Sequence, residues 1–254
     1  MTVRFKYYII YSMNTFQALI LGFVQGVTEF LPISSDGHLN LVQHLFGMTP
    51  SLSFDVFLHV ATFFSVLFFF RKKLKYFFNN LPFIIVGTIP AVIIGFFFKD
   101  QVSNLFANPK LLPLFFLFTS IYTLSTKFIK KQDKKITYLS ALIIGIFQAV
   151  ALLPGVSRSG GTIFAGLLLG LSPLNAFNFS FSLFIPISAG AILLEAKDII
   201  STNLVNPINI LAFIFTFFVG LVALKLLEKI LSGNKFWVFG VYTVILAGVL
   251  FFIL

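Results

Sequence analysis

The sequence has no cysteine and few charged residues. Without thiols the chain can form neither a disulfide nor a thiolate metal site, and its redox compartment is left open. Charged residues make up only 10% of the 254 residues, hydrophobic residues make up 58%, and the mean hydropathy is +1.01. This balance excludes an ordinary soluble domain and indicates a protein of the lipid bilayer. We expect no secretory signal peptide, because residues 1–15 lack a small-residue cleavage site after a short apolar core.

Apolar residues in this chain form long continuous runs and do not alternate with polar residues. Backbone amides in hydrocarbon must be hydrogen-bonded within a helix or a closed barrel, and continuous runs favour helices over strands. Six runs of about 17 to 23 residues are long enough to cross the bilayer. These runs are 54–70, 81–98, 111–129, 174–194, 208–230 and 236–254. The sequence therefore predicts an all-α, polytopic membrane protein with six transmembrane helices.

The net charge of +10 comes largely from three short loops. Twelve of the 18 Lys and Arg residues lie there: Arg71, Lys72, Lys73, Lys75, Lys127, Lys130, Lys131, Lys134, Lys135, Lys225, Lys229 and Lys235. Short loops rich in Lys and Arg stay on the cytoplasmic side of a membrane. We therefore interpret the positive charge as an orientation signal and expect no nucleic-acid partner.

Two further apolar stretches, 16–47 and 139–171, are interrupted near their middle. The interruptions read LPISSDGH and LPGVSRSGG, whose Pro, Gly and Ser residues break a helix. Cytoplasmic and external loops alternate consistently only if each stretch enters the membrane and returns to the same face. Non-helical backbone at that depth must be enclosed by protein or by a water-filled cavity. We predict two re-entrant helical hairpins that line a functional site.

The two interrupted stretches are repeats of each other. A shift of 123 residues without a gap aligns Gly22 with Gly145, Gln25 with Gln148, Ser34 with Ser157, and Gly37 with Gly160. Each half holds one hairpin and three crossings, and because three is odd, the second half is inverted relative to the first. We predict one membrane domain over 1–254, made of repeat 16–129 and repeat 139–254. In such inverted repeats, the amino ends of broken helices meet near the midplane and point at anionic groups.

Glu29 is the only carboxylate deep within an apolar run, and Gln25 lies one helical turn before it. A lone carboxylate in hydrocarbon costs about 2.5 to 3.5 kcal/mol on insertion scales, so Glu29 should face a cavity and have a partner. The alternative is a structural hydrogen bond between helices. Asp55 and His59, four residues apart in the next apolar run, form either a second layer of the site or an interhelical hydrogen-bonded pair.

Ser34, Ser35, Asp36 and His38 follow at the start of the second half of this hairpin. Ser34 and Asp36 could cap the helix or act in the site, and the sequence favours neither alternative. Ser35 and His38 are three residues apart and share a helical face, as a nucleophile and its base require.

Arg158 is the only arginine within a long apolar region, and it lies in the second hairpin. Its neighbours Ser157, Ser159, Gly160, Gly161 and Thr162 offer hydroxyls and flexible backbone. Backbone N–H groups at a helix start and a planar guanidinium both donate hydrogen bonds to oxyanions, which predicts a phosphate site. The alternative is that Arg158 only neutralises Glu29, which would leave the adjacent hydroxyls and glycines unused.

The segments QGVTEFLPISSDGH at 25–38 and PGVSRSG at 154–160 closely resemble the two signature motifs of the bacterial undecaprenyl-diphosphate phosphatase family, which is associated with bacitracin resistance. The order of hairpins and spans also agrees along most of the chain. The resemblance implies a fold with two re-entrant hairpins, a metal-assisted phosphatase activity, and a site that opens to the outer face of the bacterial cytoplasmic (inner) membrane.

The family's functional positions fall in both hairpins. The resemblance puts them at Gln25, Glu29, Ser35, His38 and Arg158, with Ser34, Ser157 and Ser159 nearby. Two positions depart from the family's pattern. Gln25 can bind a metal ion or water but cannot act as a base, which moves that role to Glu29 or His38. Asp36 stands where members of the family often carry Thr, and its carboxylate could bind metal.

The expected mechanism begins from charge balance. A pyrophosphate brings roughly three negative charges, so a divalent cation is expected beside Arg158. Mg²⁺ or Ca²⁺, held by Glu29 and Gln25, would bridge to the phosphates. Substrate contacts are expected from Gln25, Ser34, Ser157, Arg158, Ser159, Gly160 and Thr162. We predict Ser35 as the nucleophile with His38 as its base, and direct attack by water, with His38 or Glu29 as base, is the alternative.

The expected reaction is hydrolysis of undecaprenyl diphosphate to undecaprenyl phosphate and inorganic phosphate, which recycles the lipid carrier of cell-wall synthesis. The rival function is a transporter or flippase of a phosphorylated polyprenyl lipid, because inverted repeats with broken helices are a common transporter plan. The clustering of Ser, His, Arg and carboxylate favours hydrolysis, since translocation needs no nucleophile beside a base. The expected partners are the lipid substrate and the bilayer. The sequence is also compatible with a homodimer.

Overall fold

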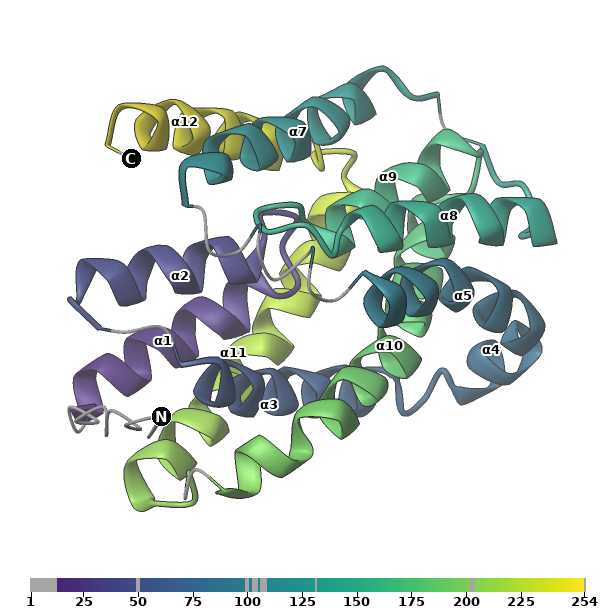
Figure 1. Ribbon diagram of the computed structural model, residues 1–254. Coiled ribbons are helices and arrows are strands. Elements are labelled where there is room, and N and C mark those ends of the chain that lie inside the picture. The colour runs from purple at the N-terminus through teal and green to yellow at the C-terminus, as the bar shows by residue number, and fades with distance from the viewer. Residues whose placement is uncertain are drawn as a thin grey trace.

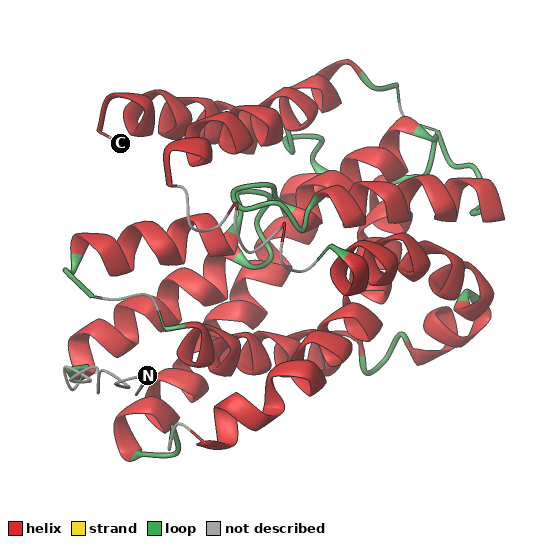
Figure 2. Ribbon diagram, viewed as in Figure 1, coloured by secondary structure: helices red, strands yellow, loops and turns green. Residues whose placement is uncertain are grey.

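The computed structural model describes residues 13–48, 51–98, 101, 105, 109–130, 132–201 and 204–253. Every regular element within these residues is helical, and no strand occurs among them (Figure 2). The all-α prediction is therefore confirmed. Residues 1–12, on which the expectation about a signal peptide largely depends, and Lys131 of the second basic loop lie outside the described part of the chain.

The helices of the two halves follow one another in a similar order (Figure 1). The first half contains α1 (Thr15–Thr28), α2 (Ser35–Leu45), α3 (Leu52–Phe70), α4 (Leu74–Asn79), α5 (Leu81–Phe97), a short 3-10 helix η1 (Pro109–Leu111), α7 (Leu112–Ser125) and a second 3-10 helix η2 (Thr126–Phe128). The second half contains α8 (Tyr138–Val150), α9 (Arg158–Leu168), α10 (Pro173–Ser201), α11 (Pro207–Ser232) and α12 (Val238–Ile253).

Three helices are long and apolar enough to cross a membrane, by length and composition: α3, α10 over Pro173–Ala196, and α11. The helices at the other three predicted spans are shorter, since α5, α7 continued by η2, and α12 each have 10 to 17 residues. Large apolar side chains are exposed on the outer surface, among them Phe97, Leu193 and Phe252. Exposed apolar surface of this extent suits lipid and not water, and it indicates a membrane protein.

The two interrupted stretches form helical hairpins, α1 with α2 and α8 with α9. The helices of the second hairpin begin 123 residues after those of the first, from 15 to 138 and from 35 to 158. Both leading helices begin with a capping box, formed by Asn14 with Gln17 in α1 and by Thr137 with Ser140 in α8. The repeat seen in the sequence therefore corresponds to equivalent local structure.

Each leading helix packs against a helix of the other half. Helix α1 lies against α11, and α8 lies against α5. Equivalent glycines permit both close approaches, because a side chain at Gly22 would meet Thr216 of α11 and a side chain at Gly145 would collide with the backbone of Gly87 in α5. The two halves are thus interlocked, and the turns of the two hairpins face each other inside the molecule (Figure 1).

Substituting Gly145 should loosen this interlock. A methyl group in Gly145→Ala would collide with backbone atoms of Gly87, which cannot rotate away, so we expect the melting temperature in detergent to fall by several degrees, for an overpacking cost of about 1–3 kcal/mol. Gly190→Ala is the matched control, because nothing lies within 4 Å of a methyl group built there. Equal melting temperatures for the two variants would contradict the close approach of α5 and α8.

Candidate active site

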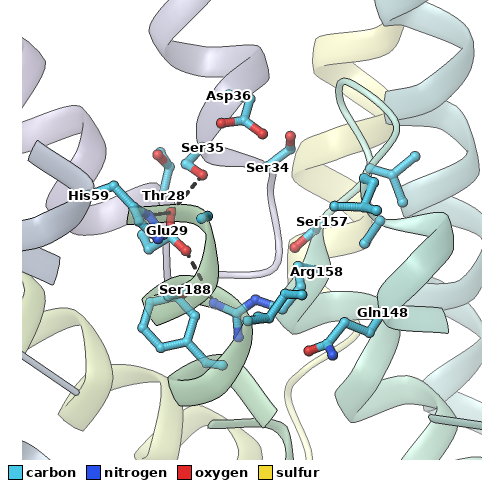
Figure 3. Close-up of a pocket in the computed structure, with 16 residues that line it drawn as sticks. Thr28, Glu29, Ser34, Ser35, Asp36, His59, Gln148, Ser157, Arg158 and Ser188 are labelled. Carbon is cyan, nitrogen blue, oxygen red and sulfur yellow. Dashed lines mark hydrogen bonds and ion pairs between the residues drawn. The ribbon is translucent and has the colours of Figure 1, made fainter. Parts of the chain in front are cut away.

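A cavity of about 220 Å³ lies where the turns of the two hairpins meet (Figure 3). Its polar lining comes from both hairpins and from α3 and α10. These residues are Thr28, Glu29, Ser34, Ser35, Asp36, His59, Gln148, Ser157, Arg158 and Ser188. Apolar side chains complete the wall, including Leu152 and Phe184. The cavity can hold a phosphate headgroup, whereas a long polyprenyl chain must lie outside it.

Glu29 is at the centre of the polar contacts. Its Oε1 accepts a hydrogen bond from Nη2 of Arg158 at 3.1 Å. Its Oε2 accepts from Ser35 Oγ at 2.9 Å and from Gln25 Nε2 at 3.1 Å. His59 Nδ1 lies 3.5 Å from the same Oε2. An acid and a hydroxyl from the first hairpin therefore meet a guanidinium from the second.

Local structure explains this convergence. Glu29 is the residue at which α1 ends, and Gln25 lies one turn earlier on the same face. Ser35 and Arg158 are the first residues of α2 and α9, so they occupy equivalent positions in the two hairpins. Each therefore extends from the start of a half-helix, where unpaired backbone N–H groups favour negative charge, toward the same carboxylate.

Arg158 retains hydrogen-bonding capacity beyond its pair with Glu29. Nη1 of the guanidinium is buried and has no hydrogen-bond partner. The ring of Phe184 lies 4.2 Å from the guanidinium carbon, a cation–π contact that leaves the edge of the guanidinium free. A buried donor without a partner costs about 1–3 kcal/mol, so an anion or a water molecule that completes it would stabilise this arrangement. The pair with Glu29 therefore uses only part of the hydrogen-bonding capacity of Arg158.

The two turns differ at their N-cap serines. Ser157 caps α9, since its Oγ accepts a hydrogen bond from Gly160 N at 3.1 Å. Ser34 makes no such bond to α2, and its φ of 69° lies in a region that residues other than glycine rarely adopt. Backbone strain of this kind is typical of functional sites. Asp36 lies within the first turn of α2 and lines the cavity, so neither Ser34 nor Asp36 serves as a side-chain cap.

The predicted pairing of Ser35 with His38 is wrong. Nδ1 of His38 lies 2.7 Å from the carbonyl oxygen of Ser34, and Nε2 lies 2.7 Å from the hydroxyl of Tyr242 in α12. The spacing does place both side chains at the start of α2, but the ring of His38 points back along the helix and onto α12, outside the cavity lining. The imidazole that does reach the site is His59 of α3.

Sequence reasoning underestimated His59. It lies mid-way along an apolar helix, and its spacing from Asp55 allowed either a second layer of the site or a hydrogen-bonded pair. The carboxylate of Asp55 instead accepts hydrogen bonds from Gln43 Nε2 at 2.8 and 3.0 Å. His59 is therefore free of that pair and turns toward Glu29.

Several residues predicted to bind substrate lie in the framework around the cavity, and their role in binding stays a prediction. Ser159, Gly160 and Thr162 do not line the cavity. Thr162 Oγ1 lies 2.6 Å from Ser180 Oγ of α10. These residues hold the turn that carries Arg158. Gln25 is also buried outside the lining, where it donates to Glu29 and to Thr62 Oγ1 and so orients the carboxylate.

The donor set of the cavity fits a hard cation only in part. Glu29, Asp36 and the hydroxyls of Ser34 and Ser35 offer oxygen ligands of the kind that Mg²⁺ and Ca²⁺ prefer. Among the described residues, no three Asp, Glu, His or Cys side chains gather into a ligand group. An ion here would need phosphate or water oxygens as well, as Mg²⁺ commonly does. Asp36 is better positioned than Gln25 to be a ligand, because Gln25 lies outside the lining.

Comparison with known proteins gives consistent results over nearly the whole chain. The family model of the bacitracin resistance protein BacA matches residues 18–249. A protein of Methanococcus maripaludis (strain C6) named undecaprenyl-diphosphatase is 42% identical over 244 residues, covering 90% of this chain and 96% of its own. Proteins of the same name from Thermosipho africanus and Carboxydothermus hydrogenoformans are 38% and 39% identical, each covering 92% of this chain and 98% and 95% of their own.

These matches extend across both hairpins and every described helix that lines the cavity. The resemblance inferred from the two motifs is confirmed. The chain belongs to the BacA bacitracin resistance protein family.

Proposed function

We propose that this protein hydrolyses undecaprenyl diphosphate to undecaprenyl phosphate and inorganic phosphate. The relatives described above carry the name of this activity over nine-tenths of the chain. The observation that carries the proposal is the meeting of Glu29, Ser35 and Arg158 in one cavity, with a guanidinium N–H left free for a phosphate oxygen. A flippase would need the positive charge of Arg158, but it would gain nothing from a serine hydroxyl that is hydrogen-bonded to a carboxylate.

The proposed membrane arrangement has six crossings and two re-entrant hairpins in inverted repeats 16–129 and 139–254. The equal offset of the hairpin helices and their reciprocal packing on α11 and α5 support it. The protein would lie in the bacterial cytoplasmic (inner) membrane and recycle the lipid carrier of cell-wall synthesis. A homodimer and the absence of a nucleic-acid partner stay predictions.

The orientation is supported by contacts among the three basic loops. Lys225 and Lys229, predicted in a loop, lie in α11. Lys73 Nζ lies 3.1 Å from Glu228 near the end of that helix, and Lys127 Nζ lies 4.8 Å from the ring of Trp237, which follows it. Gathered on one face, these loops mark the cytoplasmic side. Helix α10 begins near this face, where Lys73 Nζ donates a hydrogen bond to Asn178 Oδ1. Ser188, later in the same helix, lines the cavity. The cavity therefore lies away from the basic loops, which supports an opening toward the outer face.

In the proposed reaction, Ser35 Oγ attacks the terminal phosphorus. The bond from that phosphorus to the bridging oxygen breaks, and undecaprenyl phosphate leaves. Glu29, whose Oε2 already accepts the hydrogen bond of Ser35, takes the proton, and His59 lies beside the same oxygen. Arg158 donates to the phosphate oxygens, and water then hydrolyses the phosphoserine to release inorganic phosphate. Direct attack by water, with Ser35 only binding phosphate, is the alternative.

We also propose a divalent cation, Mg²⁺ or Ca²⁺, held by Glu29 and Asp36 together with substrate oxygens. When bound, it would neutralise charge on the diphosphate that a single arginine leaves uncompensated.

Removing the guanidinium fork should abolish turnover. We expect Arg158→Lys to lower kcat/KM at least a hundredfold, since a lysine keeps the charge but lacks the planar fork whose separate nitrogens face Glu29 and a phosphate. The measurement is phosphate release from a C55 or C15 polyprenyl diphosphate in detergent, with and without a chelator. The control Arg71→Lys, at an exposed position, should keep wild-type rates. Similar rates for both variants would contradict the proposed site.

The covalent step can be tested at Ser35. Ser35→Ala should lower kcat at least a hundredfold, and rapid quenching of the wild type should reveal phosphoserine at this position. Ser232→Ala, which changes an exposed serine bonded only to its own helix, serves as the control. A Ser35→Ala variant with full activity would exclude the serine mechanism.

The two histidines should behave differently. His59→Gln is expected to lower kcat more than tenfold without lowering the melting temperature, because His59 contacts Glu29 at the edge of the cavity. His38→Gln should lower the melting temperature as well, because it removes the contacts with Ser34 and Tyr242 that hold α2 in place. An unchanged kcat in His59→Gln would rule out a role for this imidazole.

A further inference from the structure

Gln148 presents an unpaired amide oxygen to the cavity. Its side chain is 1% exposed and lines the cavity, and its Oε1 is buried with no hydrogen-bond partner. A buried acceptor without a partner destabilises the protein, so this oxygen can accept a hydrogen bond from a ligand or a water molecule in the cavity.

The packing of α8 on α5 explains why the oxygen faces the cavity. Gly145 allows the backbones of the two helices to touch at Gly87, which brings the Gly87 carbonyl within 3.5 Å of Gln148 Nε2. A carbonyl can only accept a hydrogen bond, so the amino group of the amide must point toward α5. The oxygen is therefore directed the other way.

The two repeats differ in the partner of the amide nitrogen of this glutamine. Gln25, the equivalent residue of the first hairpin, donates to Glu29 four residues later. The residue four positions after Gln148 is Leu152, which offers no polar atom. The second hairpin thus has the glutamine but no carboxylate four residues after it.

A second unpaired atom lies in the same cavity, and its character is complementary. Nη1 of Arg158 is a buried donor without a partner, and Gln148 Oε1 is a buried acceptor. Figure 3 shows Gln148 on the opposite side of Arg158 from Glu29. A single ligand group that satisfies both must accept one hydrogen bond and donate another. A singly protonated phosphate does so, through one P–O⁻ and one P–OH.

We propose that Gln148 accepts a hydrogen bond from the P–OH of a singly protonated phosphate while Arg158 donates to a neighbouring oxygen of the same group. This inference rests on the proposed function, in which that group is the terminal phosphate of the lipid diphosphate. Gln148 is then a binding residue that favours the hydrogen phosphate form.

The test compares hydrogen phosphate with sulfate. At mildly alkaline pH both are tetrahedral dianions, but only hydrogen phosphate carries a hydroxyl to donate. Titration calorimetry of the purified protein in detergent should show hydrogen phosphate binding roughly five- to tenfold more tightly than sulfate. In Gln148→Met, which preserves length and removes the acceptor, the two affinities should become equal. All variants are compared at one pH, so the other titratable groups of the cavity, Glu29, Asp36, His59 and Arg158, are common to them.

Two further variants separate binding from folding. Gln148→Glu keeps an acceptor and adds a negative charge, so it should bind both ions more weakly yet still prefer hydrogen phosphate. Gln43→Met makes the same substitution at a buried glutamine outside the cavity, and should lower the melting temperature without changing the preference. The proposal is overturned if the wild type binds no phosphate or does not prefer it to sulfate, or if Gln148→Met retains the preference. These measurements need no turnover, so failure of the hydrolase proposal would show separately, as absent phosphate release from the diphosphate.

Discussion

The ion pair between Glu29 and Arg158 is the constraint around which the site is organised. In a chain with so few charges, the two side chains approach to 3.1 Å, with side-chain exposures of 9% and 15%. Removing two charges from water costs several kcal/mol for each ion unless the pair is close and further hydrogen bonds complete it. Gln25 and Ser35 supply such bonds to the carboxylate, whereas the guanidinium is left with one free nitrogen. That free nitrogen is the donor that the proposed function assigns to a phosphate oxygen.

The pair also links the two repeats, because each hairpin provides one partner. Neither hairpin could bury its own charged residue in an apolar surrounding alone, so the turns are stable where they face each other. Glycines at equivalent positions bring each leading helix close to a helix of the other half and keep the turns in register. The packing of helices and the electrostatics of the site therefore depend on the same interface.

Differences between the repeats generate the chemistry. Equivalent positions carry Ser35 and Arg158 at the helix starts, and Glu29 and Leu152 in the turns that follow the leading helices. One hairpin thus offers an acid and a hydroxyl, and the other offers a cation and an unpaired amide oxygen. Around them, the ring of Phe184 lies against the guanidinium and belongs to a cluster of buried aromatic residues. These rings limit the access of water and strengthen the charged contacts.

The sequence by itself determined the helical class, the bounds of both hairpins and the residues of the central pair. Helix breakers, caps and an equal offset are local features, so α1, α2, α8 and α9 begin within a few residues of where they were expected. The direction of each side chain was decided only by the tertiary structure. His38 turns away because Tyr242, 204 residues later, meets its ring, and His59 turns in because α3 packs beside α1. Such contacts join helices far apart in the chain, and spacing along one helix carries no information about them.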